Sequence, residues 1–244
     1  MKTLLAFLSL ILMINVGRAN NACPTEDTFK TANGQFTITF IGHASLMITN
    51  GDGFNIHVDP FTKVGDYSKF KAADLVLITH GHFDHLDKAA LEKIKKPDTT
   101  FIVNQAAAAS LSEAAILANG QKTEVGKITI EAVPAYNIVH KRDNDQPYHP
   151  IGEGNGYVIT IDDKRIYIAG DTENIPEMAN LGEIDIAFLP MNLPYTMTPE
   201  MTADAAKMVK PKILYPYHTS ETNTQKVVDL LKDSAIEVRI REMK

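Results

Sequence analysis

The sequence predicts an α/β fold in which two mixed β-sheets form a sandwich with helices on the outside, an αββα arrangement. In the first half of the chain, short runs of β-type residues are followed by helical patterns, and the second half repeats this order. No Pro-, Gly- or Ser-rich linker separates the halves. Each sheet can bury one face against the other and cover its second face with helices, which makes one domain.

The first half contributes four expected strands and then two helices. The strands are expected at 36–42, 45–49, 54–59 and 75–79. Gly-Asp-Gly at 51–53 predicts a hairpin turn between the second and third strands. Helical patterns follow at 88–95 and 105–120, and Gly120 is a suitable C-cap for the second helix.

The second half contributes further strands and two helices. The strands are expected at 127–133, 156–161, 165–169, 184–190 and 212–218. One helix is expected at about 199–209, where Thr198 can act as N-cap and Pro199 suits the first helical position, and another at about 223–232. The alternating run "IEVRIR" at 236–241 predicts a last strand.

The first 19 residues have the layout of a secretory signal peptide. Lys2 is followed by an apolar stretch and then by the small-x-small ending Gly17-Arg18-Ala19, which predicts cleavage after Ala19. The stretch is too short for a stable membrane span, and its lack of a polar face disfavours a buried N-terminal helix. We therefore expect an exported protein, periplasmic or secreted, with a short extension at 20–34 and the main folded domain at 35–244.

Cys23 is the only cysteine, which excludes an intramolecular disulfide and a cysteine-based metal site. Its position after the signal peptide raises the alternative of a lipid anchor. Asn20 and Asn21 suit a lipid-attachment signal poorly, so we favour the unanchored form.

The net charge argues against a nucleic-acid partner, and the glycine pattern argues against a dinucleotide cofactor. The net charge is −6 and the basic residues are scattered, which argues against nucleic-acid binding. Gly152-x-Gly154-x-Gly156 precedes an expected strand and no helix, so it is not a dinucleotide-binding loop. No feature of the sequence indicates an oligomeric state.

Histidines and aspartates gather where the expected strands end. "THGHFDHLD" at 79–87 follows the apolar run 75–78, and three further acids or histidines end other strands. The candidate metal ligands at these ends are His80, His82, Asp84, His85, Asp171 and His218. Strand ends meet at one edge of a layered α/β protein, where loops aim side chains into a shared cleft. The pattern therefore predicts a metal site.

These residue types suit a pair of divalent metal ions. Imidazole binds Zn²⁺, Fe and Mn, and a carboxylate can bridge two cations, for which Asp171 is the natural candidate. The tight loop 80–85 can send one pair of side chains to each metal. Two metals about 3.5–4 Å apart can hold a hydroxide ready for attack at neutral pH.

The sequence resembles the metallo-β-lactamase fold superfamily. "THGHFDH" (79–85) matches the signature Thr-His-x-His-x-Asp-His, and "AGDT" (169–172) matches the segment of the bridging aspartate. The segments 133–137, 149–159 and 166–178 resemble the branch that contains ascorbate-6-phosphate lactonases and N-acylphosphatidylethanolamine phospholipases. The resemblance runs from about Gln35 to the C-terminus.

The resemblance implies how the ligands divide between the metals. His80, His82 and a third histidine would bind one metal. Asp84, His85 and His218 would bind the second, with Asp171 shared. The third histidine is open, because relatives have Pro-x-x-His where this chain has Pro134-Ala135-Tyr136-Asn137.

His149 and His140 are the two candidates for the third histidine. We favour His149, since relatives with the same Pro-Ala-Tyr-Asn segment also show His-Pro before a Gly-rich turn and strand. His140 lies among charged residues typical of a solvated loop.

Three further polar residues near the expected site receive other roles. Asp59 is expected to orient a ligand imidazole through its far N–H. His43 resembles a family feature, but a histidine in a tight turn explains it equally well, so it stays outside the ligand set. His57 lies within a strand and is expected to be structural.

These residues predict a metal-dependent hydrolase of ester-type bonds, a lactone or phosphodiester in a small-molecule or lipid-derived substrate. Zinc is the expected metal, with manganese and iron as alternatives. Asp84 would orient the nucleophile and carry its proton to the leaving group. Tyr148, Asn192 and Tyr195 are candidate substrate contacts. Two alternatives are a non-haem iron redox enzyme on the same fold and a non-catalytic periplasmic metal-binding protein.

Overall fold

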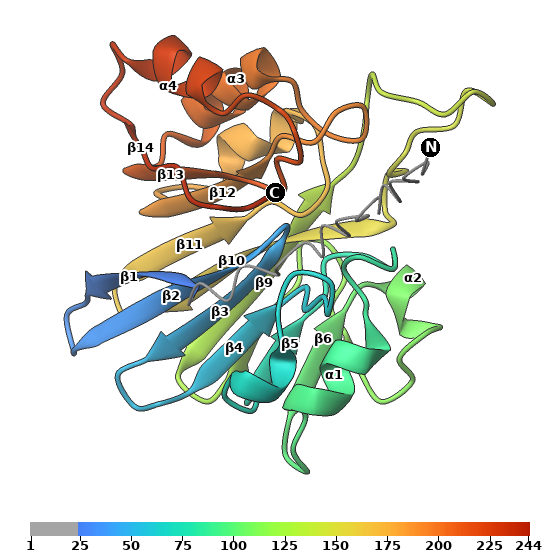
Figure 1. Ribbon diagram of the computed structural model, residues 1–244, viewed down its shortest axis with the longest axis vertical. Helices are drawn as coiled ribbons and strands as arrows, with labels where there is room; N and C mark the ends of the chain where they lie inside the picture. Colours follow the sequence, from blue (N-terminus) through green and yellow to red (C-terminus); the bar gives the residue numbers. More distant parts are fainter. Residues whose placement is uncertain (1–23) are drawn as a thin grey trace, which may run out of the picture.

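The computed structural model describes residues 24–244, which form two seven-stranded sheets packed face to face. Figure 1 shows the helices of the first half, in green, and those of the second half, in orange to red, on opposite sides of the two sheets. The expected αββα sandwich of two mixed sheets is confirmed. The predicted signal peptide (1–19) and Cys23 lie outside the described residues.

The first sheet contains the strands of the first half in the order of the sequence. Its strands are β1 (Thr25–Lys30), β2 (Gln35–Gly42), β3 (Ser45–Asn50), β4 (Asn55–Val58), β5 (Leu75–Leu77), β6 (Thr100–Val103) and β7 (Ala115–Ile116). Strands β1 to β4 pair antiparallel, and β4 to β7 pair parallel.

The second sheet repeats this plan with the second half of the chain. Its strands are β8 (Lys122–Val125), β9 (Ile128–Ala135), β10 (Gly154–Ile161), β11 (Lys164–Ile168), β12 (Ile186–Pro190), β13 (Ile213–Tyr217) and β14 (Glu237–Val238). Pairing is antiparallel from β8 to β11 and parallel from β11 to β14. The parallel strands of both sheets end in the loops that carry the expected ligands.

Four α-helices and two short 3₁₀ helices complete the fold of the described part of the chain. They are α1 (Lys88–Ile94), α2 (Gln105–Ala108), α3 (Pro199–Val209), α4 (Gln225–Leu231), η1 (Tyr67–Lys69) and η2 (Pro176–Asn180). Thr198 caps α3 by accepting a hydrogen bond from the backbone N–H of Met201, and Pro199 takes the first helical position, as the sequence predicts.

The apolar run before the histidines is a strand that is buried on both faces. Leu75 and Leu77 of β5 belong to the core between the sheets, whereas Val76 and Ile78 pack in the core beneath α1. A strand covered on both sides has no position for a polar residue, which explains why 75–78 reads as continuous apolar sequence.

The prediction of a helix at 105–120 is wrong. Helix α2 ends at Ala108, and the chain then turns back to form the edge strand β7. The N–H of Leu117 donates to the carbonyl of Val103 at 2.9 Å, and the Leu117 side chain enters the core between the sheets. Tertiary packing and sheet pairing override the helix propensity of the alanine-rich segment.

The other differences between the predicted and the observed strands lie at or next to the edges of the sheets. Strand β1 lies within the segment assigned to a short extension, and β6 and β8 fall in segments where no strand was predicted. The last strand, predicted at 236–241, is only Glu237–Val238. Short strands near the ends of a sheet make few cross-strand contacts, so they leave a weak periodic signal.

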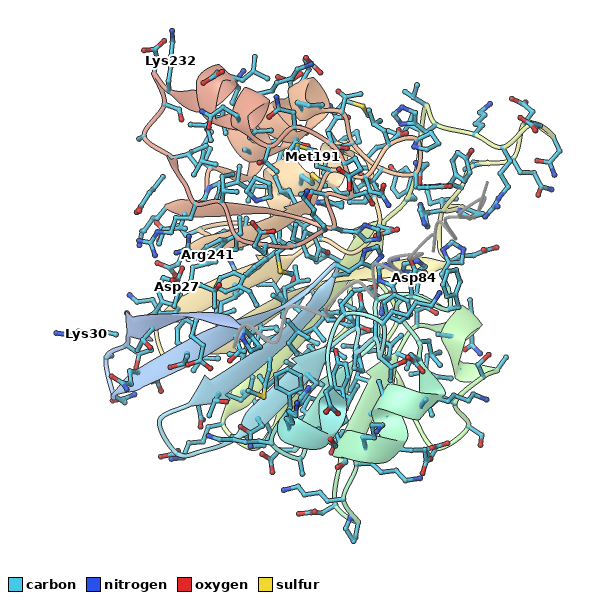
Figure 2. The ribbon with its side chains drawn as sticks, viewed as in Figure 1. Asp27, Lys30, Asp84, Met191, Lys232 and Arg241 are labelled. Carbon is cyan, nitrogen blue, oxygen red and sulfur yellow. The ribbon has the colours of Figure 1, made fainter. Side chains whose placement is uncertain are left out.

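A polar clasp joins β1 to the end of the chain. Both Asp27 carboxylate oxygens accept hydrogen bonds from Arg241 Nη2, at 2.7 and 2.6 Å, and the Tyr215 hydroxyl also donates to this carboxylate. Burial opposes ionisation, but the two donors hold the pKa of Asp27 below its ordinary value. Figure 2 shows Asp27 and Arg241 side by side, away from Asp84.

No helix among residues 24–244 combines the length and apolar character needed to cross a membrane.

His57 is a buried structural histidine on β4. Its Nε2–H donates to the carbonyl of Lys71 at 2.9 Å, and its Nδ1 has no hydrogen-bond partner among the described residues. Burial lowers the pKa of His57 from 6.5 to about 4. The folded protein therefore keeps this imidazole neutral in a pH range where the unfolded chain binds a proton.

The free energy of unfolding is expected to fall as the pH drops from 6.5 towards about 4, because only the unfolded chain takes up the His57 proton there. One such group contributes a slope of up to about 1.4 kcal/mol per pH unit. Chemical denaturation of wild type and His57→Gln at several pH values measures how the free energy of unfolding depends on pH. The variant should show a shallower slope, and equal slopes would contradict the assignment.

Candidate metal centre

All seven candidate ligands of the sequence analysis converge at one edge of the sandwich. The loop after β5 carries four of them, the loop before β10 carries His149, and Asp171 and His218 follow β11 and β13. Figure 2 labels Asp84 where the loops of the two halves meet. Among residues 24–244, their ligand atoms form groups in which every pair lies within 4.8 Å.

The first group contains three imidazoles, those of His80, His82 and His149. His80 Nε2 lies 2.9 Å from His82 Nδ1. The His149 ring centroid lies 5.1 Å from that of His80 and 5.0 Å from that of His82. The structure thus groups the His149 imidazole with those of His80 and His82.

The second group contains Asp84, His85 and His218, with His43 beside them. His85 Nε2 lies 3.3 Å from His218 Nε2. Asp84 Oδ2 lies 3.8 Å from His85 Nε2 and 3.9 Å from His218 Nε2.

Asp171 lies between the two groups and turns one oxygen towards each. Its Oδ1 lies 3.6 Å from His85 Nε2 and 3.5 Å from His218 Nε2, whereas its Oδ2 lies 3.3 Å from His149 Nε2. Asp171 Oδ1 is buried without a hydrogen-bond partner among the described residues. Each group of candidate ligands therefore has one oxygen of this carboxylate beside it.

Gly170 allows Asp171 to reach this position. Its φ is +67°, and a Cβ there would lie 2.7 Å from the carbonyl oxygen of Asn155. Only glycine combines that backbone conformation with so close an approach.

Hydrogen bonds at the far side of two imidazoles fix their tautomers. His85 Nδ1–H donates to Asp59 Oδ2 at 2.8 Å, and His149 Nδ1–H donates to Asn137 Oδ1 at 2.6 Å. Both Nε2 atoms therefore face the cluster. Asp59 occupies the orienting position expected of it, and it also accepts from the N–H and hydroxyl of Thr79.

Asn137 stands at the position where relatives have the histidine of the Pro-x-x-His pattern. Its amide nitrogen donates to the carbonyl of Tyr195 at 2.8 Å, which leaves its oxygen for His149. The residue at the family's histidine position thus orients a different histidine.

His140, the alternative third ligand, lies elsewhere. Its Nδ1 lies 2.7 Å from Glu173 Oε1, and it belongs to neither ligand group. The buried Glu173 carboxylate also accepts from the backbone N–H groups of Ile138, Val139 and His140, which anchors the start of the loop between β9 and β10.

Burial and neighbouring charges set the protonation of the metal-free cluster. Burial lowers the pKa of His80 well below 6.5 and that of His218 to about 3, so both are neutral at pH 7. Burial also opposes the charged form of His85, but Asp171 and Asp59 raise its pKa to about 9.

Both carboxylates of the cluster stay ionised. Burial opposes ionisation of Asp84, yet its hydrogen bond with His43 and the charge of His85 lower its pKa to about 2. Burial acts the same way on Asp171, and the nearby imidazoles of His218 and His85 hold its pKa well below 3.8.

The donor set fits divalent cations. Two imidazole nitrogens 3.3 Å apart and a buried carboxylate oxygen without a hydrogen-bond partner among the described residues are unfavourable neighbours unless a cation lies between them. Imidazole nitrogens and carboxylate oxygens are the ligands that zinc and related metals take.

His43 is a site residue that the sequence analysis left outside the ligand set. Its Nε2 lies 3.0 Å from Asp84 Oδ2, and its ring centroid lies 3.7 Å from that of His218. Its φ of +54° is in the left-handed region, a conformation that is concentrated at functional sites. Its position in the turn between two expected strands and its resemblance to a family feature were the sequence signals.

A cavity of about 310 Å³ opens onto the cluster. Besides five candidate ligands, it is lined by Phe83, Arg142, Tyr148, Asn192 and Tyr195. The three residues proposed as substrate contacts therefore lie in its wall, and the rings of Tyr148 and Tyr195 meet edge to face at 5.0 Å. A concave site with aromatic walls and a polar floor suits a small ligand.

A sandwich of two mixed sheets with histidines and aspartates at the strand ends defines the metallo-β-lactamase fold class. The sequence profile of the Beta-lactamase superfamily domain matches residues 37–218. A UPF0173 metal-dependent hydrolase of Koribacter versatilis is 33% identical over 195 residues, which cover 74% of this chain and 83% of that protein. The chain belongs to the UPF0173 metal-dependent hydrolases of the β-lactamase superfamily.

Solved structures agree with this family. A Parabacteroides distasonis protein superposes with a TM-score of 0.87 at 50% identity, covering 91% of this chain and all (100%) of the other. A metallo hydrolase of Ignicoccus hospitalis superposes with a TM-score of 0.68 at 25% identity, covering 84% of this chain and 94% of the other. The superfamily predicted from the sequence motifs is confirmed.

His149→Ala is expected to lower the metal content of the purified protein by about one ion per chain, because it removes one of three imidazoles from the first group. His140→Ala is the matched control and should leave the content unchanged. Elemental analysis of both variants checks this. Loss of metal in His140→Ala with none in His149→Ala would reverse the assignment.

Proposed function

We propose that this protein is an exported hydrolase that uses two divalent cations, zinc by preference, to cleave an ester-type bond. The substrate would be a lactone or a phosphodiester, either a small molecule or derived from a lipid. The observation that carries the proposal is Asp171, whose two oxygens face two separate groups of ligands beneath an open cavity.

The reaction consumes water and releases an acid and an alcohol. Two divalent cations, when bound, supply an activated nucleophile at neutral pH and stabilise the negative charge that develops on the substrate. His80, His82 and His149 would hold one cation, and Asp84, His85 and His218 the other, with Asp171 shared between them.

Asp84 is the side chain best placed to move a proton. It lines the cavity and its side chain is 20% exposed, whereas Asp171 is only 5% exposed and faces the imidazoles. A carboxylate in this position accepts a proton from the attacking water and returns it to the alcohol that leaves. His43 positions this carboxylate through the hydrogen bond to Oδ2.

A panel of aryl esters, lactones and phosphodiesters, assayed with metal-loaded and chelator-treated protein, tests the hydrolase. We expect turnover that is lost on chelation and restored by zinc. Asp171→Asn should lose about 100-fold or more in kcat together with metal. Protein from the exported fraction should begin at Asn20, which N-terminal sequencing determines.

Two other outcomes would replace the proposal. Bound iron with oxygen consumption and no ester turnover would indicate a redox enzyme. Tight metal binding without turnover on any substrate would indicate a metal-binding protein.

Replacement of His43 should separate positioning of Asp84 from metal binding. His43→Gln keeps a donor for Asp84 and should retain kcat within a few-fold, whereas His43→Leu should lose about 10-fold or more. Both variants should keep the wild-type metal content, measured alongside kcat. Equal loss of kcat in His43→Gln and His43→Leu would show that the activity does not depend on the hydrogen bond between residue 43 and Asp84.

A further inference from the structure

Among residues 24–244, Arg142 is the only lysine or arginine that lines the cavity above the cluster. The chain as a whole carries 30 acidic and 24 basic residues. Its overall charge therefore does not attract anions, and an anionic substrate needs a local cation to bind.

The Arg142 guanidinium has no carboxylate partner. No carboxylate of residues 24–244 lies within 4.0 Å of its nitrogens. Its central carbon lies 5.1 Å from the centroid of the Tyr148 ring, and its Nη2 donates to the carbonyl of Tyr148 at 3.3 Å. A guanidinium has five N–H donors, so stacking on Tyr148 leaves most of them available to a ligand.

The backbone around Arg142 is held by hydrogen bonds. The N–H of Arg142 donates to the carbonyl of Gln146 at 2.8 Å, and the N–H of Asp145 donates to the carbonyl of Arg142 at 3.0 Å. Lys141 and Pro147 form a β-bridge beside them, and the buried Glu173 anchors the start of the same loop. The guanidinium is therefore presented from a structured hairpin.

The neighbouring lysine provides a contrast. Lys141 Nζ pairs with Asp145 Oδ1 at 2.9 Å, and Lys141 is not part of the cavity wall. Two adjacent cations thus have different surroundings: one is paired within the loop, and the other is stacked on an aromatic ring in the cavity wall.

We propose that Arg142 is a specificity residue that binds an anionic group, a carboxylate or a phosphate, carried by the substrate ester. The planar guanidinium matches both anions with two parallel hydrogen bonds, which an ammonium group cannot reproduce. The ester itself would lie over the metal ligands in the same cavity. This inference rests on the proposed hydrolase function and narrows its substrate class to anionic esters.

The first arm of the test compares two esters that differ only in charge, mono-4-nitrophenyl succinate and its methyl ester. We expect metal-loaded wild type to prefer the anionic ester in kcat/KM by about 10-fold or more. Arg142→Gln should abolish the preference, Arg142→Lys should restore part of it, and Lys141→Gln should leave it unchanged. Hydrolysis of the methyl ester should be similar in wild type and Lys141→Gln, and Arg142→Gln should lower kcat/KM less for the methyl ester than for the anionic ester.

The second arm measures binding without turnover. Calorimetric titration of metal-loaded protein with benzoate and with phenylphosphonate should give an affinity about 10-fold weaker for Arg142→Gln than for wild type with at least one anion. The anion whose affinity falls more identifies the carboxylate or the phosphate as the recognised group. Because both proteins hold the same metals, binding of the anion to metal cancels in the comparison.

The outcomes of the two arms are distinct. An unchanged charge preference together with unchanged affinities in Arg142→Gln would overturn the inference and leave the hydrolase function standing. An equal effect in Lys141→Gln would also overturn it, because general electrostatics would then suffice. If wild type cleaves neither ester nor any other substrate, the proposed function fails, and the binding arm still decides whether Arg142 binds anions.

Discussion

Buried imidazole nitrogens and carboxylates that face one another are the constraint on which this structure depends. Desolvation keeps His80 and His218 neutral, and Asp59 and Asn137 hold the far sides of two other imidazoles so that their Nε2 atoms point inward. Such an arrangement is unfavourable for an empty protein interior. It becomes favourable when a cation occupies the centre, so that stability and metal affinity are linked.

The two-sheet sandwich supplies this geometry through its strand directions. In each half, antiparallel strands give way to parallel ones, and the parallel strands all end at the same edge. Asp59 and His218, which follow β4 and β13, and His43, in the turn between β2 and β3, adopt left-handed backbone conformations. Strain of this kind persists only where the surrounding structure enforces it, and here two packed cores do so.

The strands and the 79–85 ligand loop could be predicted from the sequence, because residues that are adjacent in the chain determine both. The segment 105–120 was misassigned because its composition favours a helix, while distant contacts with β6 and the core decide its conformation. His43 meets Asp84 across 41 positions, and no spacing rule reports such a contact. Asn137 looked like a missing ligand, although it supports His149.

The clasp between Asp27 and Arg241 has a consequence for how the protein is made. These residues are separated by 214 positions, and the N–H of Thr219 also binds the carbonyl of Met243. On the ribosome, Asp27 emerges 214 residues before Arg241. The outermost strand of the first sheet therefore cannot gain this link to the second half until the segment that follows β14 has been made.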